Sequence, residues 1–283
     1  MKLTWCTDTH LDFLEGQGGS QAELGFVAPL SQVDCDGFFF TGDVSSAGFL
    51  LRHLRILDSR LRRPVYFVLG NHDFWGSDFE GVRRQVRSLC GASKNLVYLT
   101  DVGHVSLSPR TALVGHDGWY DALHGDPESS GIMMNDWTKI SDFFVISGIM
   151  PGTPPWAIRP NLGAVVALSR KSAFAAAEHV REHAAAAAVD HDVVLIATHV
   201  PPFVEAHNPD GKSYSESAIP WYTSKLMGDA ILDVAQENPD VRFEVFCGHT
   251  HGGFDCQVAD NVNCHVGESQ YGSPGVAGTL QIP

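Results

Sequence analysis

Basic side chains are scarce in this sequence, which limits the partners that the protein can bind. Only 19 of its 283 residues are lysine or arginine, against 33 aspartates and glutamates, and the formal net charge is −14 at pH 7. Affinity for a polyphosphate chain grows from lysine and arginine side chains that displace counterions. We therefore expect no extended nucleic acid among the partners of this protein.

Long apolar runs and paired cysteines are also missing. No apolar run approaches the ~20 residues that a membrane-spanning helix requires, so we expect no membrane partner. The apolar residues that follow Lys2 are too few for a signal peptide. The six cysteines form no CxxC pair and no zinc-finger spacing. Together these absences favour a cytoplasmic protein with reduced thiols.

What is present is typical of a folded globular protein. Hydrophobic residues make up 44% of the chain and charged residues 18%, and a chain of this length can bury a sizeable core. The sequence contains no internal repeat, no clear linker and no block of like charge. It therefore predicts a single domain over residues 1–283.

Short apolar runs alternate with helical patterns along the chain, which indicates an α/β fold. Strands are predicted over residues 3–7, 37–41, 65–69, 96–99, 105–107, 112–115, 193–197 and 243–247. Helices are predicted over residues 44–61, 79–89, 164–189 and 225–236. The tail, residues 258–282, has the pattern of two or three short antiparallel strands.

Two segments lack a regular periodicity. Residues 119–161 contain three tryptophans and several glycines and prolines, with one possible short helix over 137–144, and residues 201–222 form a second long loop. Long loops inside compact domains are often lids or binding segments, so we expect both of them near a functional site. An irregular insertion that only packs against the body is the alternative.

Metal-binding side chains follow most of the predicted strands, in five short clusters. The clusters are Asp8-Thr9-His10, Gly42-Asp43, Gly70-Asn71-His72-Asp73, Thr198-His199 and Gly248-His249-Thr250-His251. The carboxyl ends of parallel strands are where α/β folds build their sites. A single Asp-x-His is a weak signal, but five clusters at such positions predict one shared metal site.

The residue types in these clusters suit two divalent metals. Side chains at positions i and i+2 of a strand share a face, so Asp8 and His10 can bind one ion. His249 and His251 have the same spacing and could reach different ions if the turn separates them. Asp43 can bridge two metals through its two oxygens, or cap the helix that follows it, and the two roles are compatible. Mixed nitrogen and oxygen donors favour Mn, Fe, Zn, Co or Ni over Mg or Ca.

The remaining two clusters add a neutral ligand, a proton carrier and a further imidazole. The amide oxygen of Asn71 is a plausible metal ligand, which leaves His72 beside the metals and free to transfer a proton. His199 ends a strongly apolar strand, which is a poor place for a lone imidazole. A core histidine with satisfied hydrogen bonds is the alternative to a metal ligand there.

The order DxH, GD, GNHD, H and GHxH over residues 8–251 resembles the calcineurin-like metallophosphoesterase superfamily. The resemblance implies a four-layer α/β/β/α sandwich with two central mixed sheets and a dinuclear metal centre at the strand ends. It also implies the ligands: Asp8, His10 and His251 for the first metal, Asn71, His199 and His249 for the second, and Asp43 as the bridge. By the same resemblance, His72 stabilises the transition state and protonates the leaving oxygen.

The chain departs from the protein Ser/Thr phosphatase branch, whose motifs read GDxVDRG and RGNHE. The corresponding stretches here are Gly42-Asp43-Val44-Ser45-Ser46 and Leu69-Gly70-Asn71-His72-Asp73. Because no acid stands at Ser46, the Asp–His dyad of that branch is not supplied from this position. The partner of His72 is left open, and a protein-phosphatase role is disfavoured.

These inferences predict a metal-dependent phosphohydrolase that cleaves a small-molecule phosphomonoester or phosphodiester. A hydroxide bridging the two metals would attack phosphorus, and His72 would add about 10²–10⁴-fold to the rate. A nuclease of the same superfamily is one alternative, which the acidic charge disfavours. A non-catalytic binding scaffold that retains the fold is another, and it would be expected to lack some of the ligands.

Overall fold

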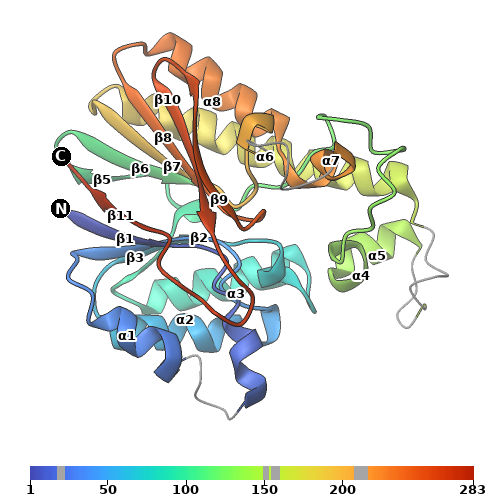
Figure 1. Cartoon of the computed structure of the whole chain (residues 1–283), viewed down its shortest axis with the longest axis horizontal. Coiled ribbons are helices and arrows are strands. Elements are labelled where there is room, and N and C mark those ends of the chain that lie inside the picture. Colours follow the sequence, from blue (N-terminus) through green and yellow to red (C-terminus); the bar gives the residue numbers. More distant parts are fainter. Residues whose placement is uncertain (18–22, 149–152, 154–159, 207–215) are drawn as a thin grey trace.

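Two β-sheets lie face to face at the centre of the structure, with helices on their outer faces (Figure 1). The computed structural model describes residues 1–17, 23–148, 153, 160–206 and 216–283. Helices α1 (Ala28–Ser31), α2 (Ala47–Leu61) and α3 (Phe79–Ala92) cover one sheet. The other sheet is covered by α6 (Leu162–Ala188) and α8 (Lys225–Glu237). The predicted α/β/β/α sandwich is confirmed.

Both sheets are mixed, as predicted. The first has the order β11-β1-β2-β3-β4. Its parallel strands are β1 (Lys2–Cys6), β2 (Gly37–Thr41), β3 (Val65–Val68) and β4 (Leu96–Tyr98). Strand β11 (Gly278–Gln281) is antiparallel to β1. The second has the order β5-β6-β7-β8-β10-β9. Its parallel strands are β6 (Thr111–Gly115), β7 (Val193–Ala197), β8 (Arg242–Cys247) and β10 (Val262–Glu268), with β5 (His104–Ser108) and β9 (Gly252–Ala259) antiparallel at the edges.

Alternating side chains of β2 explain how the layers are packed. Phe38 and Phe40 belong to the apolar core that also contains residues of α2 and α3. Phe39 points to the opposite face, as the two-residue period of a strand requires, and it meets Phe246 of β8 with ring centroids 5.5 Å apart. A strand that is buried on both faces has a continuous run of apolar residues in its sequence, and residues 37–41 have this pattern.

The start of α2 differs from the prediction. The helix begins at Ala47 rather than at Val44, and its N-cap residue is Ser46. The backbone N–H groups of Val44 and Ser45 instead donate to the buried carboxylate of Asp73, at 3.3 and 2.8 Å. These bonds hold the segment in a turn, so the alternative role of Asp43, as the cap of this helix, is excluded.

The tail and the irregular segments also differ in part from the predictions. The tail does form three strands, but β9 begins before residue 258, β10 lies parallel to β8, and β11 joins the other sheet. Residues 137–144 were predicted as one helix, and the chain forms two, α4 (Asp136–Lys139) and α5 (Ser141–Ser147). A further short helix is α7 (Ile219–Tyr222). Residues 149–152, 154–159 and 207–215 of the two irregular segments lie outside the described residues.

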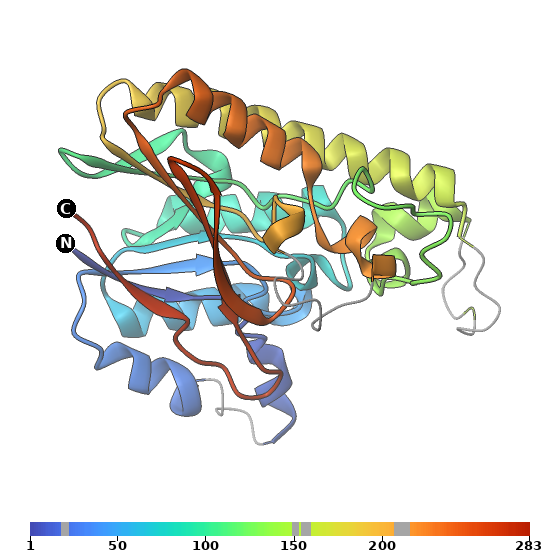
Figure 2. The same cartoon turned by 45° about the horizontal axis from the view of Figure 1, so that its top comes forward.

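The direction of the strands defines the end of the molecule where the polar clusters lie. Both chain termini lie at the end of the sheets opposite α4, α5 and α7 (Figures 1 and 2). Strand β1 leads from the N-terminus toward that far end, and β2 and β3 run parallel to it. The carboxyl ends of these strands therefore open toward the irregular segments. Among the described residues, no helix has both the length and the apolar character needed to cross a bilayer.

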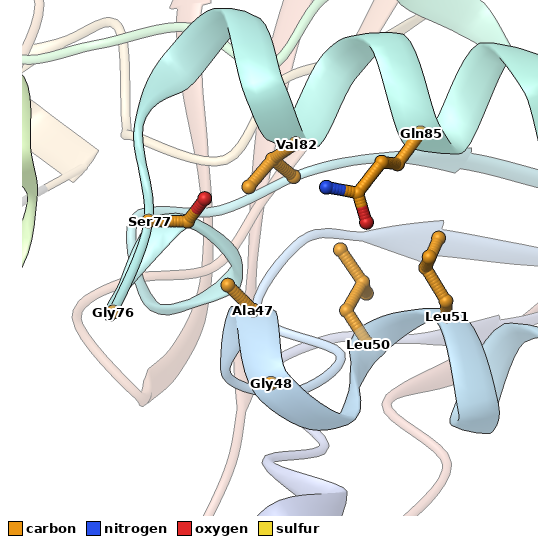
Figure 3. Close-up of a pocket in the computed structure, with 8 residues that line it drawn as sticks. All are labelled: Ala47, Gly48, Leu50, Leu51, Gly76, Ser77, Val82 and Gln85. Atoms are coloured by element: carbon orange, nitrogen blue, oxygen red, sulfur yellow. The ribbon is translucent and has the colours of Figure 1, made fainter.

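A cavity of about 200 Å³ lies between α2 and α3 (Figure 3). Its lining consists of Ala47, Gly48, Leu50, Leu51, Gly76, Ser77, Val82 and Gln85. None of the predicted metal-binding residues reaches it, and it contains no ionisable side chain. This cavity is therefore not the candidate functional site.

Candidate metal centre

The five sequence clusters meet at one place, at the carboxyl ends of β1, β2, β3, β7 and β8. All seven predicted metal-binding residues are there: Asp8, His10, Asp43, Asn71, His199, His249 and His251. Six of them are buried, and His251 is partly exposed. The strand ends of both sheets lie at the same end of the molecule, which brings His10 and His251, 241 positions apart, into contact.

Four side chains form a first group of donors. The Nε2 atom of His251 lies 3.1 Å from Oδ1 of Asp8 and 3.3 Å from Nε2 of His10. His10 Nε2 in turn lies 3.7 Å from Oδ2 of Asp43. Ligands bound to one ion at about 2.0–2.2 Å lie roughly 3–3.5 Å apart. The spacing of this group therefore fits a single metal ion.

A second group is built around the amide of Asn71. Its Oδ1 atom lies 3.0 Å from Nε2 of His199 and 3.0 Å from Nδ1 of His249. Oδ2 of Asp43 is 3.4 Å from Nε2 of His199, so this carboxylate oxygen stands beside both groups. The other Asp43 oxygen accepts the backbone N–H of His72 at 2.8 Å, which fixes the orientation of the carboxylate.

The electrostatics of the centre favour bound cations. Burial disfavours the charged form of His199, yet the Asp43 carboxylate overcomes this and raises the pKa of His199 to about 10. The histidines in turn hold the pKa of the buried Asp43 well below its usual range. Burial lowers the pKa of His249 to about 3, so its imidazole is neutral and can offer a lone pair. Two buried carboxylates beside imidazole and amide donors fit two divalent cations, and a cation bound at His199 would replace the proton that the carboxylates favour there.

The backbone has a particular conformation at most of these positions. Five of the seven residues have positive φ angles: Asp8 (47°), His10 (41°), Asp43 (51°), His249 (66°) and His251 (57°). In the described part of the chain, only Arg62 and Ala122 share this property among the non-glycine residues. After β1, β2 and β8 the chain thus turns through the left-handed region, and this turn directs the side chains into the centre.

Gly70 lies so close to the centre that no side chain fits there. A Cβ atom at this position would overlap the carboxylate of Asp43 and would lie 2.7 Å from Cε1 of His199. We expect Gly70→Ala to displace both side chains and to weaken metal binding at least about 10-fold, as losses at metal-site partners commonly do. Titration of Mn(II) into the apoprotein measures this effect. Gly91→Ala in α3 is the matched control, because nothing lies within 4 Å of its Cβ; equal affinities in the two variants would contradict the prediction.

His72 lies next to both groups of donors. Its ring stacks on Trp75, with centroids 3.3 Å apart, and its Nε2 lies 3.5 Å from the Tyr271 hydroxyl and 3.9 Å from Oδ2 of Asp43. Its buried Nδ1 atom has no hydrogen-bond partner among the described residues, so no carboxylate there forms a dyad with it. Burial lowers the pKa of His72 to about 3, and the imidazole of the free protein is neutral.

A cavity of about 120 Å³ opens onto the two groups. Asp43, Asn71, His72 and His249 line its polar side. The rest of its lining is aromatic or comes from the segment before α4: Trp75, Tyr222, Tyr271, Ile132, Met133, Met134, Asn135 and Asp136. The two irregular segments therefore both contribute walls, which agrees with the expectation that they lie near the site.

Comparison with known proteins identifies the family. The family profile described as calcineurin-like phosphoesterase matches residues 1–253. The chain belongs to the calcineurin-like phosphoesterase family. It is accordingly a hydrolase that acts on phosphoester bonds, and the resemblance seen in its motifs is confirmed.

Solved structures share the fold of this phosphoesterase. The phosphopantetheinyl hydrolase PptH from Mycobacterium tuberculosis superposes with a TM-score of 0.62 at 14% identity, covering 95% of this chain and 89% of that one. A dimetal phosphatase from Danio rerio gives a TM-score of 0.50 at 15% identity, covering 95% and 87%. A search of curated proteins finds no match.

Three tryptophan side chains near the centre of the phosphoesterase pack in the protein interior. Trp119, Trp137 and Trp221 are almost fully buried, and the last two meet edge to face with centroids 4.9 Å apart. Because these three indole rings are buried, they cannot stack on a substrate. The packing interpretation of the insertion therefore holds for Trp119 and Trp137 but not for the residues that line the cavity, and Trp156 lies outside the described residues.

Four residues around the phosphoesterase centre were not assigned a role from the sequence: Asp73, Trp75, Asp136 and Tyr271. Asp73 belongs to the GNHD cluster and accepts the N–H groups of Gly70 and Ser45, both at 2.8 Å, so it ties two ligand-bearing turns together. Its position in the motif was a usable signal. No local pattern marks the other three, which reach the centre only through the tertiary fold.

Proposed function

We propose that the protein is a dinuclear metal-dependent phosphohydrolase that cleaves a small-molecule phosphoester. One observation carries this proposal. Oδ2 of Asp43 lies 3.7 Å from the His10 imidazole of one donor group and 3.4 Å from the His199 imidazole of the other. A carboxylate oxygen in this place could be shared by two metal ions, while the other oxygen is held by the N–H of His72.

The chain's own side chains divide into two metal sets. Asp8, His10 and His251 would hold one ion, and Asn71, His199 and His249 the other, with Asp43 shared. The mixed donors suit Mn, Fe, Zn, Co or Ni. When bound, two such ions supply Lewis acidity, which lowers the pKa of water and offsets charge on the phosphoryl oxygens.

The other residues around the cavity hold and position the substrate. His72 faces the cavity beside Asp43, where it can give a proton to the leaving oxygen. A bound phosphate anion would raise the low pKa of this imidazole, because a nearby negative charge favours the protonated form. Trp75, Tyr222 and Tyr271 offer flat apolar surfaces on which a planar or apolar leaving group can pack.

Hydrolysis of two chromogenic esters tests the proposal. Manganese-loaded protein should hydrolyse bis-p-nitrophenyl phosphate, p-nitrophenyl phosphate or both, and the preferred compound would distinguish a diesterase from a monoesterase. A chelator should remove essentially all turnover, and added Mn(II) should restore it, because the reaction depends on the metals. Turnover that survives complete metal removal would overturn the proposal. No turnover of either ester by protein shown to hold two metals would favour the scaffold alternative.

The charge of the protein separates this proposal from a nuclease of the same family. The net charge of −14 works against a polyphosphate chain, whereas a small ester needs only the local charge of the metals.

The six cysteines are free thiols, which supports our proposal that the enzyme works in the reducing cytoplasm.

A further inference from the structure

A buried carboxylate from outside the five clusters contacts one of the proposed metal ligands. Asp136, the first residue of α4, has no exposed surface. Its Oδ1 atom accepts a hydrogen bond from Nδ2 of Asn71 at 2.8 Å and another from Nε1 of Trp75 at 2.7 Å. Asp136 follows Asn71 by 65 positions and belongs to the irregular segment, so only the tertiary fold brings the two together.

The orientation of the Asn71 amide decides whether this side chain can bind a metal. An amide presents an oxygen on one side and an NH₂ group on the other, and only the oxygen is a ligand. In the observed orientation Oδ1 points toward His199 and His249, at 3.0 Å from each. A flipped amide would instead point two N–H donors toward the cation.

The oxygen that Asp136 presents to Asn71 is a hydrogen-bond acceptor, and this excludes the flipped orientation. Oδ1 of Asp136 already accepts the indole N–H of Trp75, which can only donate. A flipped Asn71 would place its own oxygen against this acceptor, so its NH₂ group faces Asp136 and its oxygen faces the centre. The bond from Trp75 holds Asp136 itself in place, and the Trp75 ring lies against His72. The irregular segment thus holds the proposed ligand Asn71 through the oriented side chain of Asp136.

We propose that Asp136 is a positioning residue for the second metal, because it fixes the Asn71 amide with its oxygen toward the ion. This inference rests on the proposed dinuclear centre. It gives the irregular segment that contains α4 a role beyond packing, because Asp136 supports a metal site whose ligands all come from the strand ends.

Calorimetric titration of Mn(II) into the full-length apoprotein tests this role. Partners of metal ligands commonly contribute about 10–100-fold in affinity. Asp136→Leu should therefore weaken the second Mn(II) site by about 10–100-fold and leave the first unchanged. Asp136→Asn retains an oxygen acceptor of the same size and should recover most of the lost affinity. If Asp136 only stabilised the fold, Asp136→Leu would lower the melting temperature of the apoprotein and would not weaken one metal site more than the other.

Two further variants keep the proposal testable if Asp136→Leu does not fold. Asn71→Asp places a carboxylate against Asp136 and should weaken the second site. The double variant Asn71→Asp/Asp136→Asn again pairs one amide donor with one carboxylate acceptor, so it should bind the second ion more tightly than Asn71→Asp alone. A double variant that binds the second ion no better than Asn71→Asp would overturn the positioning role.

A carboxylate elsewhere in the same segment serves as the matched control. Asp142 of α5 accepts the backbone N–H of Phe79 at 2.9 Å. Asp142→Asn should leave both Mn(II) affinities unchanged. Wild-type protein that binds fewer than two ions would overturn the dinuclear proposal together with this inference. Two ions bound equally well by the wild type and by Asp136→Leu would overturn the positioning role alone.

Discussion

Asp43→Asn should abolish both the binding of a metal pair and turnover. The variant loses one of the two buried carboxylates of the centre, and an amide cannot bridge two cations through one charged oxygen. Bridged metals stabilise the transition state by several kcal/mol, and each 1.36 kcal/mol is tenfold in rate. We therefore expect kcat to fall by about 10³-fold or more, with metal content per chain well below two. Elemental analysis and hydrolysis of bis-p-nitrophenyl phosphate measure the two effects.

The backbone contacts of Asp43 do not confound this experiment. Its Oδ1 atom accepts the N–H of His72 at 2.8 Å, and the amide oxygen of asparagine can accept the same bond. A surface carboxylate provides the control: Asp101 pairs with Arg87 at 2.7 Å, and Asp101→Asn should change neither metal content nor rate. Two metals and near wild-type turnover in Asp43→Asn would show that Asp43 is not the bridge.

His72→Ala should retain both metals and lower the rate by about 10²–10⁴-fold, the usual contribution of a general acid. The loss should be greatest for esters with poor leaving groups, because a stable phenolate such as p-nitrophenolate needs little protonation. A series of aryl phosphoesters with leaving groups of increasing pKa measures this, with metal content determined in parallel. A rate loss that is independent of the leaving group would exclude proton donation by His72.

The position of His72 makes the metal measurement informative. Its Nε2 atom lies 3.9 Å from the proposed bridging oxygen of Asp43, close enough that a role as a ligand has to be tested. Loss of one metal in His72→Ala would mean that His72 is a ligand. His72→Phe keeps an aromatic ring against Trp75, so a similar rate loss in this variant would separate the chemistry of the imidazole from its packing.

The sequence was sufficient to predict the sandwich and the positions of the seven proposed ligands. Both predictions rest on the same pattern, in which buried apolar strands end in polar residues. The structure has strands at residues 37–41 and 193–197, as predicted. Asp43 and His199 each stand two residues after the end of one of these strands. Parallel strands of one sheet end at the same edge, and the predicted stacking of two sheets brings the strand ends of both to one place.

The parts that could not be predicted depend on contacts across the fold. Val44 and Ser45 have a helical pattern, but their N–H groups are bound by Asp73 and the helix starts later. The bond between Asp136 and Asn71 joins an irregular segment to a strand end. No periodicity in the sequence carries such information, because loop segments are positioned by the surface on which they pack.

The left-handed turns at the centre have a consequence for the stability of the protein. A residue other than glycine in this conformation costs about 1–2 kcal/mol, and five of the proposed ligands adopt it. The net stability of a folded domain is only about 5–15 kcal/mol. The conformational cost of these five residues is comparable to that value, and burial of the large apolar core has to offset it. Glycine at these positions would relieve the cost and remove the ligands. We therefore expect glycine at one of these positions to stabilise the metal-free protein while it weakens the binding of the metal pair.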